Sequence, residues 1–349
     1  MFEVIDTLEK LDKEAKAWRS VERSPDMLIF QTFDWCRSAW VHILSKDKAN
    51  KLWTLKWTQD GRDDVVFFPF YIDGKGTLRY ILDTDSDALN SVYSGRTANR
   101  YWCYREVADA IIAAQGIKNV SLQKMRCGSE ALDYLGVLLS GAIVYKDNAF
   151  AFMDVEPGGD IVFSRHHMRS SDRKHWRHLL KKSDKFDFDV LRQGKGDDFP
   201  EAEVGRLVSE MSAAGMRKPG FFAADMMEFV KHLYSLGLCE IPVLKENGKV
   251  ATIEFRLLKN GYVLDWIFLS SIPSTGTEIN VKYCTEKAKE FCGTMDFGVG
   301  AYEYKILTSR PKLGVTFSIK YAKNSSCFVA NLLSMCMRVG KDWIKGKRH

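Results

Sequence analysis

Hydrophobic and polar positions form their clearest pattern over residues 248–305. Two runs rich in β-branched and aromatic residues, 250–258 and 262–269, are each preceded by an Asn-Gly dipeptide, at 247–248 and 260–261. Asn-Gly between two such runs is typical of a two-residue hairpin turn. The pattern therefore predicts a β-hairpin in this part of the chain.

A helix is predicted directly after the hairpin. Apolar residues recur near helical spacing over residues 277–292, Gly293 is a typical helix stop, and a short strand pattern follows. Small residues precede the helix, and the unpaired N–H groups of a helix start attract anions. Ser274, Thr275 and Thr277 could add hydroxyl donors there, or could serve as caps alone. This segment is therefore a candidate phosphate site.

Helical and strand patterns alternate through the rest of the chain. Helices are predicted near 5–18, 30–44, 104–114, 130–139, 171–182, 201–214 and 224–236, and strands near 52–57, 65–72, 120–125, 142–145, 150–155, 186–191 and 240–245. The set favours a mixed α/β (α+β) fold with antiparallel hairpins over a purely parallel sheet. A Glu-Pro-Gly-Gly break at 156–159 predicts a domain boundary. We expect domains at 1–157 and 158–323, followed by a terminal segment, 324–349.

The composition is that of a globular protein and excludes extensive disorder, because 46% of the 349 residues are apolar and 28% are charged. No run approaches the roughly 20 apolar residues of a membrane span. Residues 1–20 form a charged amphipathic pattern without an apolar leader, so we expect a cytoplasmic protein. The eight cysteines include no CxxC pair and no Cys/His cluster, so no metal site is expected.

The charge of the chain is concentrated in one predicted helix. Residues 165–185 contain eight basic and two acidic side chains, a net charge of +6 that equals the formal charge of the whole chain. This basic stripe indicates either a solvated helix face or a wall that holds an anionic substrate. On the second interpretation, Arg173 and Arg177 are the candidate phosphate binders. No duplex nucleic-acid motif accompanies the stripe.

Three segments carry a resemblance to a known family. Residues 296–305 read DFGVGAYEYK and resemble a "DF..G...YK" signature, residues 30–35 (FQTFDW) with Trp40 resemble an "FQS..W...W" segment, and the basic helix at 171–182 resembles an "R..LRR..RKL" segment. In this order they resemble the CelD-like branch of the GNAT acyltransferase superfamily, whose relatives include the FemAB transferases. The resemblance covers most of the chain and is weakest after about residue 321.

The resemblance implies two tandem GNAT-like lobes, of which the second is catalytic. In that fold an acyl-pantetheine arm lies between two central strands that separate at their ends. Here these strands would be 250–258 and 262–269. The pyrophosphate would meet the next helix start at a loop formed by Ser274, Thr275, Gly276 and Thr277. This loop lacks the basic, glycine-rich sequence of ordinary GNAT enzymes.

Acyl transfer to an amine needs a base, and a weak acid can protonate the departing thiolate. Glu254 and Asp265 stand in apolar strand patterns, where burial raises the pKa of a carboxyl group. We expect Glu254 to be the first candidate base, Asp265 the second, and Tyr304 the acid. Alternatively, these carboxylates are structural partners of Arg or Lys side chains, Arg256 and Lys305 included.

Asp296 and Lys305 are expected to form an ion pair that orients the substrate. Together these expectations describe an N-acyltransferase that moves an acyl group from acetyl-CoA or another acyl-CoA to an amino group of an anionic sugar-type or envelope precursor. A FemAB-like transferase that uses aminoacyl-tRNA is one alternative, and a non-catalytic scaffold that binds a polymer or a protein is another. The apolar and basic segment 324–349 predicts a docking helix or a peripheral contact with an anionic membrane.

Overall fold

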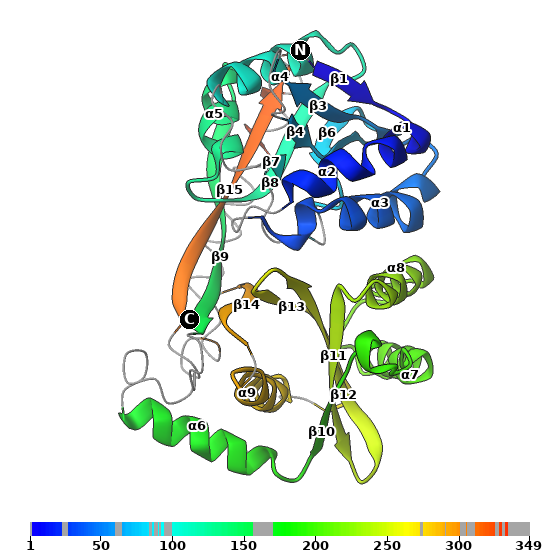
Figure 1. Cartoon of the computed structure of the whole chain (residues 1–349), viewed down its shortest axis with the longest axis vertical. Helices are drawn as coiled ribbons and strands as arrows, with labels where there is room; N and C mark the ends of the chain where they lie inside the picture. Colours follow the sequence, from blue (N-terminus) through cyan, green and yellow to red (C-terminus); the bar gives the residue numbers. More distant parts are fainter. Residues whose placement is uncertain are drawn as a thin grey trace. The chain divides into compact units, whose positions relative to one another are not determined.

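The computed structural model describes residues 2–22, 27–59, 65–83, 86, 90, 92–93, 100–155, 170–272, 275–289, 291–300, 305, 311–324, 328–329 and 332–333. The chain divides into two compact units (Figure 1). The first contains residues 1–148 and 315–349, and the second contains residues 149–314. The boundary predicted after residue 157 lies outside the described residues and stays a prediction.

The first unit contains two groups of strands. One is antiparallel, in the order β1 (Phe2–Ile5), β3 (Thr54–Thr58), β4 (Val65–Phe68) and β7 (Val92–Tyr93). The other has the order β15 (Lys312–Ala322), β8 (Asn119–Arg126), β6 (Thr77–Tyr80), β5 (Phe70–Ile72) and β2 (Lys51–Leu52), in which only β6 and β8 are parallel. The helical segments of this unit are α1 (Leu8–Lys13), α2 (Ala15–Val21), η1 (Ile29–Gln31), α3 (Phe33–His42), η2 (Leu44–Lys46), α4 (Arg100–Ala113) and α5 (Glu130–Leu138).

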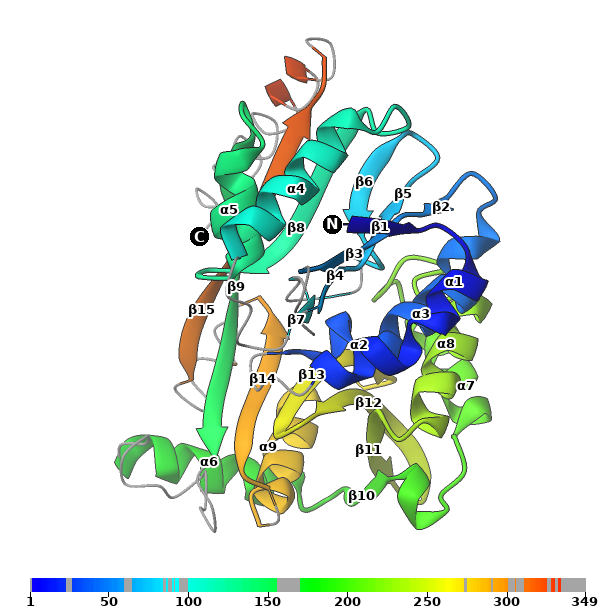
Figure 2. The same cartoon turned by 45° about the horizontal axis from the view of Figure 1, so that its top comes forward.

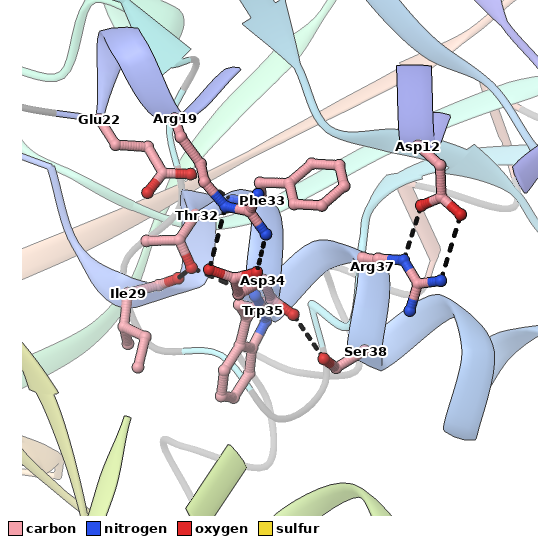
Figure 3. Close-up of polar contacts among 10 residues, drawn as sticks. All are labelled: Asp12, Arg19, Glu22, Ile29, Thr32, Phe33, Asp34, Trp35, Arg37 and Ser38. Carbon is pink, nitrogen blue, oxygen red and sulfur yellow. Dashed lines mark hydrogen bonds and ion pairs between the residues drawn. The ribbon is translucent and has the colours of Figure 1, made fainter. Parts of the chain in front are cut away.

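The FQTFDW segment forms part of the core of the first unit (Figure 3). The Thr32 hydroxyl caps α3 by accepting from the Trp35 N–H at 3.2 Å, and Glu22 accepts from the Phe33 N–H at 2.6 Å. Arg19 pairs with Asp34 at 2.6 Å on the outer side of the same turn. Capping and ion pairing of this kind fix the start of a helix. In this chain the segment therefore has a structural role.

The second unit is a sheet covered by helices on both faces. Its strand order is β10 (Asp187–Leu191), β11 (Cys239–Glu246), β12 (Lys249–Lys259), β13 (Tyr262–Ser270), β14 (Gly293–Val299) and β9 (Ile143–Val155). Figure 1 shows α7 (Glu201–Ala213) and α8 (Ala224–Ser235) on one face, and α6 (Ser170–Ser183) and α9 (Gly276–Lys287) on the other. A short 3-10 helix, η3 (Gln193–Lys195), follows β10.

The predicted hairpin is confirmed as the antiparallel pair β12 and β13. Its turn residues Asn260 and Gly261 both have positive φ, 38° and 75°, as do Asn247 and Gly248 in the turn before β12. Two successive positive φ angles characterise the turn type whose twist matches a β-hairpin. The Asn-Gly dipeptides therefore determine where β11, β12 and β13 reverse direction.

The strands that separate are β13 and β14. The prediction that 250–258 and 262–269 would separate is wrong. β12 and β13 pair along their whole length, from Thr252 with Ser270 to Lys259 with Tyr262. β13 and β14 lie side by side (Figure 2) and are parallel, and in these fully described strands pairing ends at Leu264 with Asp296. A hairpin turn keeps β12 on β13, whereas α9 connects β13 to β14 and leaves their carboxyl ends free to diverge.

Gly293 makes the close end of this strand pair possible. It has a φ of +148°, and a Cβ atom there would overlap the carbonyl group of Gly261. Its role differs from the predicted helix stop, because α9 already ends at Lys287. The strands are thus in tight contact at their first residues and apart at their last.

The terminal segment is described only at residue 324 and at four helical positions, 328–329 and 332–333. Within the described part of the chain, no helix is long and apolar enough to span a bilayer. The docking helix and the membrane contact therefore stay predictions.

Candidate functional site

A cavity of about 360 Å³ lies in the second unit where β13 leaves β14. Its wall is formed by Arg217, Glu254, Asp265, Phe268, Gly276, Thr277, Asn280, Phe297 and Lys305. Five of these, Glu254, Asp265, Gly276, Thr277 and Lys305, are residues predicted from the sequence. Three strands, the start of α9, the loop before α8 and Lys305 contribute to one concave surface, which is typical of a small-molecule site.

A β-bulge brings Asp265 to the wall of the cavity. The register between β12 and β13 shifts after Phe255, so Arg256 faces Asp265, where an unbroken ladder would place Trp266. The displaced Trp266 packs edge-on against Phe229 of α8, with ring centroids 6.0 Å apart. Bulges commonly redirect a side chain beside a functional site. This one places a second carboxyl group next to Glu254.

Glu254 is a buried carboxyl group held by a buried cation. Its side chain is 2% exposed, and the side chain of Arg256 is fully buried. Arg256 Nε and Nη2 lie 2.7 and 2.5 Å from Glu254 Oε2. Burial raises the pKa of Glu254 well above its ordinary value, Arg256 opposes that rise, and the adjacent Asp265 adds to it. The group therefore has the raised pKa that a base needs.

The start of α9 supplies backbone donors to the same cavity. Gly276 and Thr277 are its first residues and line the cavity, and the N-cap residue Thr275 makes no side-chain capping hydrogen bond. Thr275 is buried, and its hydroxyl group contacts Thr252 at 2.8 Å and Ser270 at 2.6 Å. Thr275 therefore holds the loop in place, while Ser274 lies outside the described residues.

The electrostatic field at this helix start has contributions of both signs. Glu278, in the first turn of α9, is 3% exposed and pairs with Lys182 of α6 at 2.8 Å. A carboxylate near the helix start opposes the attraction of an anion, and the lysine partly cancels it. Lys305 and Arg217 add positive charge on the cavity wall. These cations and the positive end of the helix offset the charge of Glu278 for an anionic group bound at the helix start.

Asp296 and Lys305 are placed differently. Lys305 lines the cavity and its ammonium group donates to the carbonyl oxygen of Phe297. Asp296 is buried, accepts from the Tyr262 hydroxyl group and accepts from the Gly298 N–H at 2.8 Å. These contacts fix the backbone of β14 beside the cavity. The predicted ion pair between the two residues stays a prediction.

Arg173 and Arg177 lie on α6 and are not among the residues that line the cavity. Arg173 is half-buried and Arg177 is exposed. The buried face of the helix is anchored by Trp176, whose indole N–H donates to the Thr285 hydroxyl group of α9 at 3.3 Å. An anion-binding role for the two arginines stays a prediction. Tyr304 lies outside the described residues.

Four wall residues were not predicted from the sequence, namely Arg217, Phe268, Asn280 and Phe297. Asn280 follows Thr277 by one helical turn, a spacing that places both on one face and could have identified it. Arg217 comes from the loop between α7 and α8, which no local pattern connects with β12. In that loop Phe222 is buried and stacks on Phe255, with ring centroids 5.9 Å apart.

No protein-family model and no curated protein sequence matches the chain. Solved structures do share its fold. The C-terminal domain of a protein assigned as a lysylphosphatidylglycerol synthetase from Agrobacterium fabrum is 12% identical and matches with a TM-score of 0.59, over 92% of this chain and 95% of that chain. FemX is 11% identical and matches with a TM-score of 0.55, over 92% and 97%.

A third match is L-PGS from Bacillus licheniformis, with a TM-score of 0.54 and 16% identity over 80% of this chain and 88% of that chain. The fold of the chain is GNAT-like. The predicted mixed α/β fold class with two GNAT-like lobes is thereby confirmed. Assignment to the CelD-like branch stays a prediction. Identities this low show the fold alone.

Proposed function

We propose that the second unit is an acyltransferase site that transfers an acyl group from a thioester to an amine. The observation that carries this proposal is the position of the cavity. It lies where two parallel strands separate, and both a carboxyl pair and a helix start open into it. A strand gap can hold an extended arm through backbone hydrogen bonds, and a helix start can hold a phosphate group.

The donor we propose is acyl-CoA, as acetyl-CoA or a longer thioester. Its pantetheine arm would lie between β13 after Leu264 and β14 after Asp296, where neither strand pairs with the other. Gly276 and Thr277 would direct N–H groups to its pyrophosphate, and Lys305 would add a cation. A Cβ atom at position 276 would lie 3.5 Å from the Phe268 ring, so a larger side chain there would occupy the cavity.

The acceptor we propose is an amino group on an anionic sugar-type or envelope precursor. The ammonium form first loses a proton to the Glu254–Asp265 pair, and the neutral amine then attacks the thioester carbonyl carbon. As the C–S bond breaks, the thiolate leaves and takes up a proton, and the new amide nitrogen loses one. One proton is released overall, and Glu254, whose pKa is raised by burial, can pass it on.

A second donor class is favoured by the structural comparisons. The chain shares its fold with FemX and with a domain assigned to a lysylphosphatidylglycerol synthetase. In a FemAB-like reaction the donor is an aminoacyl ester of tRNA, and the ester carbonyl would replace the thioester in the same cavity. The basic stripe on α6 suits either donor.

Calorimetric titration with acetyl-CoA and with a longer acyl-CoA tests the donor. We expect micromolar binding to the unmodified protein and to Gly205→Trp, whose side chain would project from an open surface of α7. We expect Gly276→Trp to abolish binding. Retained binding by Gly276→Trp would overturn the placement of the donor, and absence of binding to the unmodified protein would overturn acyl-CoA as the donor.

If acyl-CoA does not bind, an aminoacyl-tRNA gel-shift separates the two remaining functions. Arg173→Glu combined with Arg177→Glu should weaken tRNA binding if the FemAB-like reaction applies. A scaffold function would instead predict that this double variant loses a polymer or protein partner while neither donor binds at all.

A further inference from the structure

Arg256 does not line the cavity, yet it contacts the carboxyl group that does. Its Nε and Nη2 atoms, at 2.7 and 2.5 Å, both contact the same oxygen, Oε2 of Glu254. Nη2 also donates to Asn280 Oδ1 at 2.8 Å. Because both nitrogen atoms contact Oε2, the other carboxylate oxygen of Glu254, Oε1, is left for other partners. The guanidinium group thus fixes the rotation of the carboxyl group as well as its charge.

A second layer of contacts fixes Arg256 itself. Its guanidinium carbon lies 4.1 Å from the centre of the Tyr283 ring of α9. The Tyr283 hydroxyl group donates to Glu240, which also receives Lys287 at 2.9 Å and Arg192 at 2.8 Å. A cation over an aromatic face in a dry interior is strongly localised. Arg256 therefore cannot move without disturbing a buried network.

Asp265 adjoins Glu254 on the cavity wall, and its charge adds to the rise in the pKa of Glu254. Two carboxylates at one site disfavour each other's ionised form, so Asp265 makes Glu254 hold its proton more tightly. Because Arg256 contacts Oε2, the other oxygen, Oε1, is left to exchange a proton. Arg256 and Asp265 therefore act on the pKa of Glu254 in opposite directions.

Stability alone does not explain a buried arginine in this environment. Among the described residues, no partner is present for Arg256 Nη1, although the side chain is fully buried. A buried cation with an unmade hydrogen bond is unfavourable compared with an apolar side chain of similar volume. The position of Arg256 is better explained by what it does to Glu254.

We propose that Arg256 is a positioning residue, which holds Glu254 Oε2 so that the Glu254–Asp265 pair presents its proton-accepting edge to the amine in the cavity. The role of Arg256 in the reaction rests on the proposed function. In the transfer step an N–H bond of the ammonium breaks, its proton passes to a carboxylate oxygen of the pair, and the electron pair stays on nitrogen. Arg256 keeps its own protons throughout. Arg256 from β12 acts on Glu254 directly. Asn280, Tyr283 and Cys284 from α9 act on Arg256, and Lys305 and Arg217 line the same cavity as the pair.

The test is a carbon-13 NMR titration of labelled glutamate and aspartate side chains in the full chain. The variants are Arg256→Met, Arg256→Lys and Arg192→Met. Removing the cation from Glu254 should raise its titration midpoint by about one pH unit or more, because an opposite charge within hydrogen-bond distance shifts a pKa by that order. Arg256→Lys keeps the charge without the two-nitrogen grip, so its midpoint should lie between those of the unmodified protein and Arg256→Met.

Arg192→Met is the control for the outer part of the network: it breaks the arginine–Glu240 pair, while Lys287 and the Tyr283 hydroxyl group still hold Glu240 and every contact of Arg256 with Glu254 is kept. It should leave the Glu254 midpoint unchanged. An unmoved midpoint in folded Arg256→Met would overturn the proposal. If Arg256→Met does not fold, an unmoved midpoint in Arg256→Lys would do the same.

The titration needs no substrate, so it separates this inference from the proposed function. If transferase activity is present, the pH profile of kcat should shift upward with the midpoint in Arg256→Lys, an effect that a purely structural role would not produce. A shifted midpoint in a protein without any transferase activity would refute the function and leave the control of Glu254 by Arg256 intact.

Discussion

Replacing Glu240 with Gln should destabilise the second unit by about 3 kcal/mol at neutral pH, because a broken buried pair leaves an uncompensated charge. Glu240 is 1% exposed, and its carboxylate receives Lys287, Arg192 and the Tyr283 hydroxyl group. Lys287 and Arg192 are 11% and 24% exposed, so some water reaches them. The expected loss therefore lies at the lower end of the range for buried pairs.

The effect of Glu240→Gln should depend on pH in a defined direction. Burial raises the pKa of Glu240, but Lys287, Tyr283 and Arg192 together outweigh it and bring the pKa below its ordinary value. A carboxyl group with a lowered folded-state pKa stabilises the protein above its unfolded-state pKa, and this stabilisation is lost as pH falls through the folded-state value. The difference between Glu240→Gln and the unmodified protein should therefore shrink in acid.

Urea denaturation followed by tryptophan fluorescence, at pH 7 and in acid, measures this difference. Glu246→Gln on the same strand is the control, because Glu246 is 36% exposed and its partner Lys185 lies 3.3 Å away. An exposed pair of this kind contributes about 1 kcal/mol or less. If Glu240→Gln were no more destabilising than Glu246→Gln at pH 7, the buried network would not hold α9 to the sheet as described.

Four further substitutions, one of them a control, test other parts of the fold by urea denaturation. Gly293→Ala should cost about 2 kcal/mol or more, because its Cβ would overlap Gly261, whereas Gly205→Ala should gain about 0.5 to 1 kcal/mol in open helix. Burial raises the pKa of Asp83 to about 6, so the folded protein binds the Asp83 proton more tightly than the unfolded chain does. The free energy of unfolding should therefore fall by about 2 to 3 kcal/mol between pH 4 and 7 as this proton is lost. Asp83→Asn should not show this fall. Thr275→Val should cost about 1 to 2 kcal/mol by removing a buried hydroxyl network, and should weaken acyl-CoA binding in calorimetry.

Local signals in the sequence were sufficient for the hairpin and for the buried carboxyl group. Asn-Gly at residues 260–261 dictates a turn whatever its surroundings, because few other residues adopt two positive φ angles in succession. Glu254 in an apolar strand was expected to be buried, and it is 2% exposed. Both inferences depend on neighbours in sequence, which a pattern can capture.

The separation of β13 from β14 and the way Arg256 holds Glu254 depend on residues that are close in space but distant in sequence. Pairing between β13 and β14 ends at Leu264 because of how α9 returns the chain, and no residue near Leu264 signals it. Arg256 was expected only as one of several partners for a buried carboxylate. The structure shows that it contacts Glu254, a near neighbour in sequence, and at the same time Asn280, which is 24 residues away.

Two separate features of β13 meet at Asp265. Pairing with β14 ends one residue earlier, at Leu264, and the bulge that shifts the register with β12 falls one residue later, at Trp266. Without the bulge, Asp265 would not be opposite Arg256 and Glu254 would lack its carboxyl neighbour. Without the strand separation, the pair would face a closed ladder. Within three residues, β13 stops pairing with β14 and changes its register with β12, and these two changes together give the cavity its charged wall. The site therefore depends on strand register and not on any single motif.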